Sequence, residues 1–251
     1  MRTMLWRSFL GMSVVIFLNL GVSAAPDEMS LFFKANEAYR QGDYAKAARI
    51  YERILQSGKT SGNLYYNLGN GYFKSGRLGS AVLSYERARR LMARDADLIA
   101  NEQFARSQVE ASPEPKASFF KMRFFDYCAY LTTDEWTIFV FVLGLATVIA
   151  HLLSLQQNWS VRQSRFWAGL FFLIWISHAG ILVFKVNQQK DQAIILQKTD
   201  AFFEPRIKAT IHFSLSEGTK VKSLKVEPPW VKIERSDGKM GWVQADTLEK
   251  I

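Results

Sequence analysis

The sequence predicts an α + β multidomain membrane protein with three structural parts. A 34-residue repeat with helical periodicity precedes residue 110, two long uncharged apolar runs lie between residues 136 and 185, and short β-rich runs follow residue 193. These observations predict, in this order, an α-helical solenoid, a two-helix transmembrane hairpin and a small β-barrel.

The N-terminus carries an export signal. Arg2 and Arg7 precede an apolar stretch that ends at Val22-Ser23-Ala24. A basic start, an apolar run and small residues are typical of a secretory signal peptide. We expect residues 1–24 to be cleaved after Ala24. An uncleaved anchor is the alternative, and either version exports the residues that follow.

Two apolar runs, residues 136–155 and 166–185, form the predicted hairpin. Up to Phe184 neither contains a charge, and each suffices to cross a hydrocarbon core of about 30 Å as a helix. Buried helices of a soluble protein are the alternative, but such helices seldom lack a polar face over this length. Trp136, Trp159 and Trp167 lie where interfacial aromatic residues belong.

The hairpin fixes the topology. Two crossings place both flanking parts on one side of the membrane, and the signal peptide puts that side in the periplasm. The connecting loop, residues 156–165, carries Arg162 and Arg165 but no acid, as suits a cytoplasmic loop. The predicted location is therefore the bacterial inner membrane, crossed twice after signal cleavage, with both soluble domains in the periplasm.

The repeat lies in residues 28–110. Residues 35–55 align with residues 69–89 at an offset of 34, and the aligned pairs include Gly42 with Gly76 and Tyr51 with Tyr85. This period and a helix–turn–helix pattern are the signature of tetratricopeptide (TPR) repeats. Gly42 and Gly76 should close tight turns, and Tyr51 and Tyr85 should fill the layer between the paired helices. We expect repeats at 28–61 and 62–95 and a capping helix at 96–110.

The segment between the repeats and the membrane, residues 111–135, is predicted to be a linker and a juxtamembrane helix. Ser112-Pro113-Glu114-Pro115 ends the repeat domain, and Phe120, Phe124, Cys128 and Leu131 then recur at helical spacing. This spacing indicates an amphipathic helix on the membrane surface. Thr132 and Glu135 form a predicted capping box for the first span.

The first helix of each repeat should line a concave face that binds protein partners. Aromatic and amide side chains with few cations suit an extended peptide, whose backbone groups the amides would satisfy. The alternative is that the aromatic residues only pack against a neighbouring helix or the membrane. The expected groove residues are Phe32, Asn36, Tyr39, Arg40, Asn63, Tyr66, Asn70, Phe73 and Lys74.

Capture of a C-terminal carboxylate by this groove is not expected. TPR domains with a carboxylate clamp use asparagines at the positions of Asn36 and Asn67, which are present. However, Phe32 replaces the clamp lysine, and Asp97 and Asn101 stand where cations are needed.

Short β-rich runs in residues 193–251 predict four strands: AIILQ (193–197), TKVKSLKVE (219–227), WVKIERS (230–236) and MGWVQA (240–245). This part of the chain resembles a bacterial SH3-type domain. A tryptophan-led strand, an Asp237-Gly238 turn, a Gly-Trp-Val run and a short closing strand follow one another in EPPWVKIERSDGKMGWVQADTLEKI. Alternation should place Val231 and Ile233 inward. We expect Trp242 in the core and Trp230 on the surface, where it would be the candidate ligand-binding residue.

The sequence offers no catalytic motif. Neither CxxC, HExxH, GxSxG nor a phosphate-binding glycine loop occurs, and His151 and His178 would lie at different depths in the membrane. We expect His178 to hydrogen-bond to Ser177 or to a partner protein. No enzyme activity, cofactor or metal is therefore predicted. Because the basic residues behind the net charge of +9 are scattered, attraction to anionic lipid is expected rather than nucleic-acid binding.

The segment YYNLGNGYFKSGRLGSAVLSYERARRL and the order of modules resemble the BatE-like proteins of bacterial aerotolerance (Bat) operons. The resemblance implies a non-enzymatic scaffold in an aerotolerance or envelope-stress complex. The implied partners are membrane proteins with von Willebrand factor A domains and, indirectly, a MoxR-type AAA+ ATPase. Two other functions stay open: a peptidoglycan sensor that uses the SH3-like domain, and an assembly factor for an exported enzyme.

Overall fold

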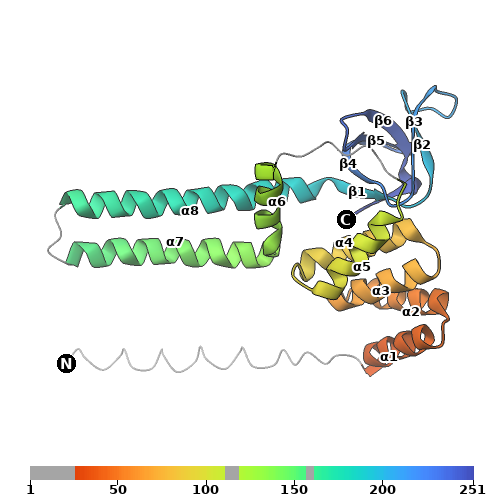
Figure 1. The fold of residues 1–251 in the computed structure, drawn as a ribbon, viewed down its shortest axis with the longest axis horizontal. Helices are drawn as coiled ribbons and strands as arrows, with labels where there is room; N and C mark the ends of the chain where they lie inside the picture. Colours follow the sequence, from red (N-terminus) through yellow and green to blue (C-terminus); the bar gives the residue numbers. More distant parts are fainter. Residues whose placement is uncertain (1–25, 111–118, 157–160) are drawn as a thin grey trace, which may run out of the picture.

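A computed structural model describes residues 26–110, 119–156 and 161–251. Within these ranges the chain is α + β, with eight α-helices and one seven-stranded antiparallel sheet (Figure 1). The predicted signal peptide, the proline-containing linker up to residue 118 and part of the loop between the apolar runs lie outside the described residues.

Five helices form a stack of antiparallel neighbours, called the helical stack below. They are α1 (Pro26–Arg40), α2 (Tyr44–Gln56), α3 (Gly62–Lys74), α4 (Leu78–Leu91) and α5 (Ala96–Ser107). Gly42 and Gly76 adopt a φ of 81° in the two-helix turns, a left-handed conformation that favours glycine. The predicted tight turns are therefore present at both positions.

The 34-residue offset is visible in the packing of the stack. The hydroxyl of Tyr51 donates to Asn36 Oδ1 at 2.5 Å, and the hydroxyl of Tyr85 donates to Asn70 Oδ1 at 2.7 Å, so the same bond recurs in each helix pair. Both tyrosines are buried, as predicted. Leu98 and Ala105 of α5 are fully buried against the preceding helices and close the stack.

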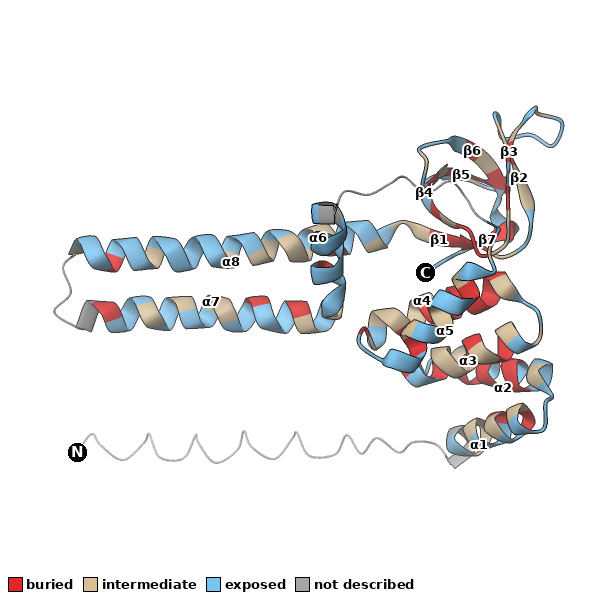
Figure 2. Ribbon diagram, in the orientation of Figure 1, coloured by how far each residue is buried: buried red, intermediate tan, exposed pale blue. Residues whose placement is uncertain are grey.

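Two long helices form the hairpin. α7 spans Thr133–Gln156 and α8 spans Val161–Lys190, and both are long and apolar enough to cross a membrane. Most residues of both helices are coloured as exposed in Figure 2, and many of them are large apolar residues that lipid would cover in a membrane. α8 continues past the predicted end at residue 185 and leads almost directly into the sheet.

The start of α7 has the predicted capping box. The backbone N–H of Glu135 donates to Thr132 Oγ1 at 3.2 Å, and the backbone N–H of Thr132 donates to Glu135 Oε2 at 2.8 Å. Arg94 of the helical stack also donates to both carboxylate oxygens of Glu135, at 2.6 and 2.9 Å. Arg94 therefore joins the helical stack to the first turn of α7.

Helix α6, Phe119–Tyr130, lies across the end of the hairpin (Figure 1). Lys185 Nζ of α8 donates to the Cys128 carbonyl at 2.8 Å, and Trp136 Nε1 of α7 donates to the same oxygen at 3.2 Å. The sequence predicts one apolar face, but exposed apolar side chains lie on several sides of this helix. They are Phe120, Met122, Phe124, Phe125, Tyr127 and Tyr130.

His178 connects α8 to α6. Its Nε2 lies 3.2 Å from the Tyr127 hydroxyl, and its Nδ1 lies 2.8 Å from the Ile174 carbonyl. Ser177, the expected partner, is its neighbour on the same helix at 3.4 Å. The helix-to-helix bond therefore goes to Tyr127, because α6 crosses the hairpin at the level of His178.

The sheet has the order β3-β2-β6-β5-β4-β1-β7. Strands β1, β4, β5 and β6 match the predicted runs and β7 is the short closing strand, whereas β2 and β3 were not predicted. The bounds are β1 (Gln192–Ile195), β2 (Thr199–Phe202), β3 (Ile211–Leu215), β4 (Lys220–Glu227), β5 (Trp230–Arg235), β6 (Met240–Gln244) and β7 (Leu248–Lys250). Residues from both edge strands share one core cluster, so the sheet curls around it.

The predictions for the two tryptophans of the sheet are wrong. Val231 pairs with Val243 on the inner face, which leaves Lys232 and its partner Trp242 on the outer face, where Trp242 is only half-buried. Trp230 is on the outer face too, yet it is only 6% exposed, because Phe202 of β2 packs edge-on against it at 5.7 Å between ring centroids. Trp230 is thus not a free surface for a ligand.

Candidate protein-binding groove

The structure brings five of the predicted groove residues to one cavity. Tyr39 of α1 and four residues of α3, namely Tyr66, Asn70, Phe73 and Lys74, line a space of about 370 Å³. Tyr85 of α4 and two residues of α5, Asn101 and Phe104, complete the lining. The first helices of the two repeats, α1 and α3, therefore build this groove together with α5 and one residue of α4.

Asn101 ties the groove together. Its Nδ2 donates to the Tyr66 hydroxyl at 2.9 Å and to Asn70 Oδ1 at 3.0 Å. Since Asn70 also accepts from Tyr85, it is held from two sides. An amide fixed in this way keeps its remaining groups aimed in one direction, which suits recognition of another chain's backbone.

The aromatic end of the groove is formed by two phenylalanines. Phe73 and Phe104 contact each other edge to face, with centroids 5.5 Å apart. Phe104 is 59% exposed although it is large and apolar. Lys74 next to them is exposed as well and is the one charged residue of the lining.

Four expected residues do not line the groove. Phe32 packs edge-on against Tyr51, with centroids 6.0 Å apart, and belongs to the margin of the core. Asn36 is used as the acceptor for Tyr51. Asn63 is exposed at the start of α3, and Arg40 pairs with Glu37 on its own helix. Helical periodicity placed these residues near the concave face, but intramolecular partners occupy Phe32, Asn36 and Arg40.

Three lining residues were missed: Tyr85, Asn101 and Phe104. A signal for two of them exists in the sequence, since the 34-residue offset places Asn101 at the position of Asn67 and Phe104 at that of Asn70. Treating α5 only as a cap concealed this. Tyr85 was predicted to fill the layer between helices, and it does so while its hydroxyl reaches the groove.

Lys74 is the charged residue of the groove lining, and the phenols of Tyr39 and Tyr85 are neutral. Burial, with the neighbouring phenols of Tyr44 and Tyr66, raises the pKa of Tyr39, and burial likewise raises the pKa of Tyr85. Both phenols are therefore neutral at physiological pH and act as hydrogen-bonding groups on aromatic rings. Such a lining offers aromatic faces and hydrogen-bonding groups to another chain.

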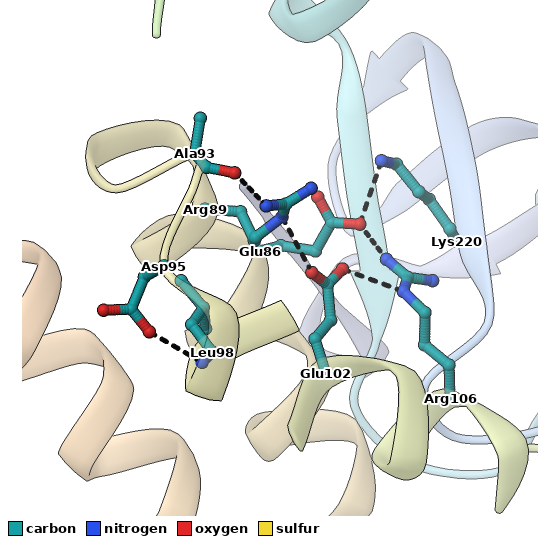
Figure 3. A network of polar contacts seen from close by, with 8 residues as sticks. All are labelled: Glu86, Arg89, Ala93, Asp95, Leu98, Glu102, Arg106 and Lys220. Atoms are coloured by element: carbon teal, nitrogen blue, oxygen red, sulfur yellow. Dashed lines mark hydrogen bonds and ion pairs between the residues drawn. The ribbon is translucent and has the colours of Figure 1, made fainter. Parts of the chain in front are cut away.

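Behind the groove, an ion-pair network joins the helical stack to the sheet (Figure 3). Glu86 of α4 accepts from Lys220 of β4 at 3.0 Å and from Arg106 of α5. Glu102 of α5 pairs with Arg89 at 3.2 Å and with Arg106 at 3.0 Å. Three cations thus share two carboxylates across this junction.

The junction perturbs two of these groups. Burial raises the pKa of Glu102, while the charges of Arg89 and Lys220 oppose the rise. Although 34% of the Lys220 side chain is still exposed, burial and the positive charge of Arg106 lower the pKa of Lys220 to about 7. Lys220 therefore gives up its proton more readily than an exposed lysine does.

Backbone contacts extend the junction. A Cβ built on Gly79 of α4 would lie only 2.7 Å from the carbonyl oxygens of Ile195 and Leu196. Ile194 of β1 is part of the core of the helical stack. Arg87 donates to Glu249 at 2.7 Å, which adds an ion pair to the same contact. The groove is therefore fixed relative to the sheet.

Comparison with known proteins does not assign this chain to a family. No protein-family model matches this chain, and no curated protein matches its sequence. Within residues 26–110, 119–156 and 161–251, no three His, Cys, Asp or Glu side chains gather in a way that could hold a metal ion. The groove and its fixed position on an apolar hairpin are the features on which a function must rest.

Proposed function

We propose that the protein is a non-enzymatic adaptor of the bacterial inner membrane that holds protein partners beside the membrane. The helical stack acts as a short TPR solenoid and its groove takes an extended segment of a partner. The sheet acts as an SH3-like module. The observation that carries the proposal is a groove on a stack that is held to two apolar helices. It combines the hydrogen-bonded amides Asn70 and Asn101 with the half-buried ring of Phe73 and the exposed ring of Phe104.

The lining favours a particular kind of partner segment. Tyr39, Tyr66 and Phe73 offer flat apolar surfaces, and the amides offer groups for backbone N–H and C=O. Lys74 adds one positive charge at the exposed end. An extended segment with aromatic or aliphatic side chains and one acidic residue complements this surface best.

The membrane arrangement follows from the same proposal. α7 and α8 cross the inner membrane, and the helical stack and the sheet both lie in the periplasm after export by the signal peptide. The resemblance to BatE-like proteins supplies the partner class: membrane proteins with von Willebrand factor A domains, and through them a cytoplasmic MoxR-type ATPase. Peptidoglycan is less favoured as a ligand, since Trp230 is covered by Phe202.

The test uses the two exposed residues of the groove. Phe104→Ala combined with Lys74→Glu removes an aromatic surface and reverses the charge. Among the ring contacts described above, it removes only the edge-to-face contact with half-buried Phe73. We expect crosslinking in membranes to a von Willebrand factor A-domain partner to fall about tenfold or more, because exposed aromatic anchors dominate such interfaces. The measurement is crosslinking followed by affinity capture of the tagged full chain.

A matched control lies on α1. Phe33, 62% exposed, and its neighbour Lys34 are the same pair of residue types outside the groove. Phe33→Ala with Lys34→Glu should leave capture unchanged. Equal losses in both double variants, or no loss in either, would remove the groove assignment.

A further inference from the structure

We propose that a second cavity binds the headgroup of an anionic phospholipid. This cavity, about 320 Å³, lies where the helical stack, α6, the end of α8 and the sheet meet. The proposal rests on the insertion of α7 and α8 into a membrane, but not on the identity of any protein partner.

The cavity has an excess of positive charge. Its lining includes the cations Arg89, Arg90, Lys185 and Lys220. Only two carboxylates, Glu86 and Glu102, face them, and the junction described above already uses both. Arg90 and Lys185 pair with neither of these side chains, so an anion from outside the chain would add to their charge compensation.

Lys185 is the lining cation that has no carboxylate partner among the described residues. It donates to the backbone carbonyls of Cys128 and Leu131. Arg90 donates to the Gln189 carbonyl at 2.9 Å and to an oxygen of Ile251, the last residue of the sequence, at 2.7 Å. Lys185 is only 8% exposed. A cation buried with carbonyl partners alone is costly, and a bound phosphate would offset that cost.

The place of the cavity selects a lipid. The uncharged run of α8 ends at Phe184, and Lys185 follows at once, so the cations stand at the level where a membrane-spanning helix leaves the hydrocarbon. The lining also includes apolar residues of α6 and α8, among them Phe125, Ala129 and Phe184. Phe184 contacts Phe125 with centroids 6.0 Å apart.

Polar and apolar groups are thus arranged as in a phospholipid. The phosphate would lie between Arg90, Lys185 and Lys220, with glycerol hydroxyls near Gln188. The first carbons of an acyl chain would lie over Phe125 and Phe184. A free phosphate ester fits the cationic half but leaves the aromatic half unused, so the lipid is the better complement.

Binding can be measured on the full chain in micelles of zwitterionic detergent. Phosphatidylglycerol is titrated in, and native mass spectrometry counts retained lipid molecules. Phosphatidylcholine and glycerol 3-phosphate serve as comparison ligands. We expect retention of phosphatidylglycerol, at least tenfold weaker retention of phosphatidylcholine, and no competition by an equal concentration of glycerol 3-phosphate.

Two variants locate the site. Arg90→Gln with Lys185→Gln removes the excess charge. Because Lys185 also holds α6, a second variant, Gln188→Glu, adds a negative charge to the lining through an exposed residue. Both should weaken phosphatidylglycerol retention at least tenfold. Asn187→Asp adds the same charge on the adjacent exposed residue, outside the lining, and should retain the lipid.

Three results would overturn the lipid site. The first is retention of phosphatidylcholine equal to that of phosphatidylglycerol, and the second is wild-type retention of phosphatidylglycerol by Gln188→Glu. The third is displacement of the lipid by glycerol 3-phosphate at equal concentration, which would assign the cavity to a soluble phosphate ester. A negative result for the lipid would not contradict the proposed partner-binding groove, since Phe104→Ala with Lys74→Glu tests partner capture independently.

Discussion

At the scale of single residues, the repeat changes its chemistry where it meets the sheet. Glu52 of α2 accepts a hydrogen bond from Tyr72 of α3. The equivalent Glu86 of α4 accepts from Arg106 of α5, which lies 34 residues after Tyr72. Glu86 also accepts from Lys220 of the sheet. One substitution in the pattern, tyrosine to arginine, thus turns an internal packing contact into part of an interdomain ion network.

Lys220 makes the stability of this network depend on pH. Its pKa is about 7 in the folded chain, whereas an unfolded lysine titrates near about pH 10.4. Between these values the unfolded chain binds more protons, so stability rises with pH in this window. We expect the melting temperature of the wild type to rise relative to Lys220→Met between pH 6.5 and 8.5, measured by thermal unfolding in zwitterionic micelles.

Lys222→Met provides the comparison for this pH series. Lys222 is the next residue on the same face of β4, two positions after Lys220, and it is exposed. Its loss should leave the pH profile parallel to that of the wild type. Parallel profiles for Lys220→Met as well would show that Lys220 keeps its proton throughout, contrary to the pH-dependent junction.

At the scale of helices, the hairpin is held by one close approach and several polar bonds. A Cβ on Gly144 of α7 would lie 2.7 Å from Trp175 Nε1 of α8, and that nitrogen donates to the Val140 carbonyl at 3.1 Å. Near the loop, the hydroxyls of Ser154 and Ser164 lie 2.7 Å apart and are buried. Small residues and buried polar bonds are the usual means of association between helices in lipid.

Gly144→Val tests the close approach. The added side chain must displace the Trp175 ring, and overpacking of this kind costs about 1–3 kcal/mol. We expect a lower melting temperature in micelles and a change in tryptophan fluorescence.

Gly180→Val is the matched variant for that experiment. Gly180 lies in the other long helix, and its Cβ would meet no atom within 4 Å. This variant should melt like the wild type. If Gly144→Val is equally neutral, the two helices do not pack through Gly144.

At the scale of the whole molecule, the groove is useful only if the stack stays fixed on the membrane-anchored part. Three contacts do this: the ion network, the close approach of Gly79 to β1, and the bonds from Arg94 to Glu135 at the start of α7. The position equivalent to Gly79 in the first repeat is Ala45, which meets no sheet. Of these two equivalent positions, only the one that the backbone of β1 approaches is a glycine.

Gly79→Ala should loosen the molecule as a whole. The new methyl group meets backbone atoms, which cannot rotate away, so the stack must shift from the sheet. Spin labels at Gln56 and Lys239, both exposed, report this shift in a Cys128→Ala background. We expect a broader or longer distance distribution than in the parent, whereas Gly180→Ala should leave it unchanged. An unaltered distribution in Gly79→Ala would mean that the junction is not set by this contact.

Much of the fold was predictable because its signals are local. The offset of 34 residues gave the turns at Gly42 and Gly76 and the buried Tyr51 and Tyr85, and uncharged length gave α7 and α8. Strands β2 and β3 were not predicted because their runs are short and the segment between them carries turn residues instead of a hairpin signal. The burial of Trp230 and Trp242 was predicted wrongly because the burial of a side chain depends on the neighbouring strand as well as on alternation. Here Phe202 of β2 covers Trp230.

The sequence by itself determined which segments become helices, which run is apolar enough for a membrane, and five members of the groove. Only the tertiary structure decided that Asn101 and Phe104 belong to the groove, that Asn36 is used internally, and that a cationic cavity exists. The reason is physical. Helix formation and apolar length are properties of consecutive residues, whereas the junction joins groups such as Gly79 and Glu217 that are 138 residues apart, and no local pattern encodes their meeting.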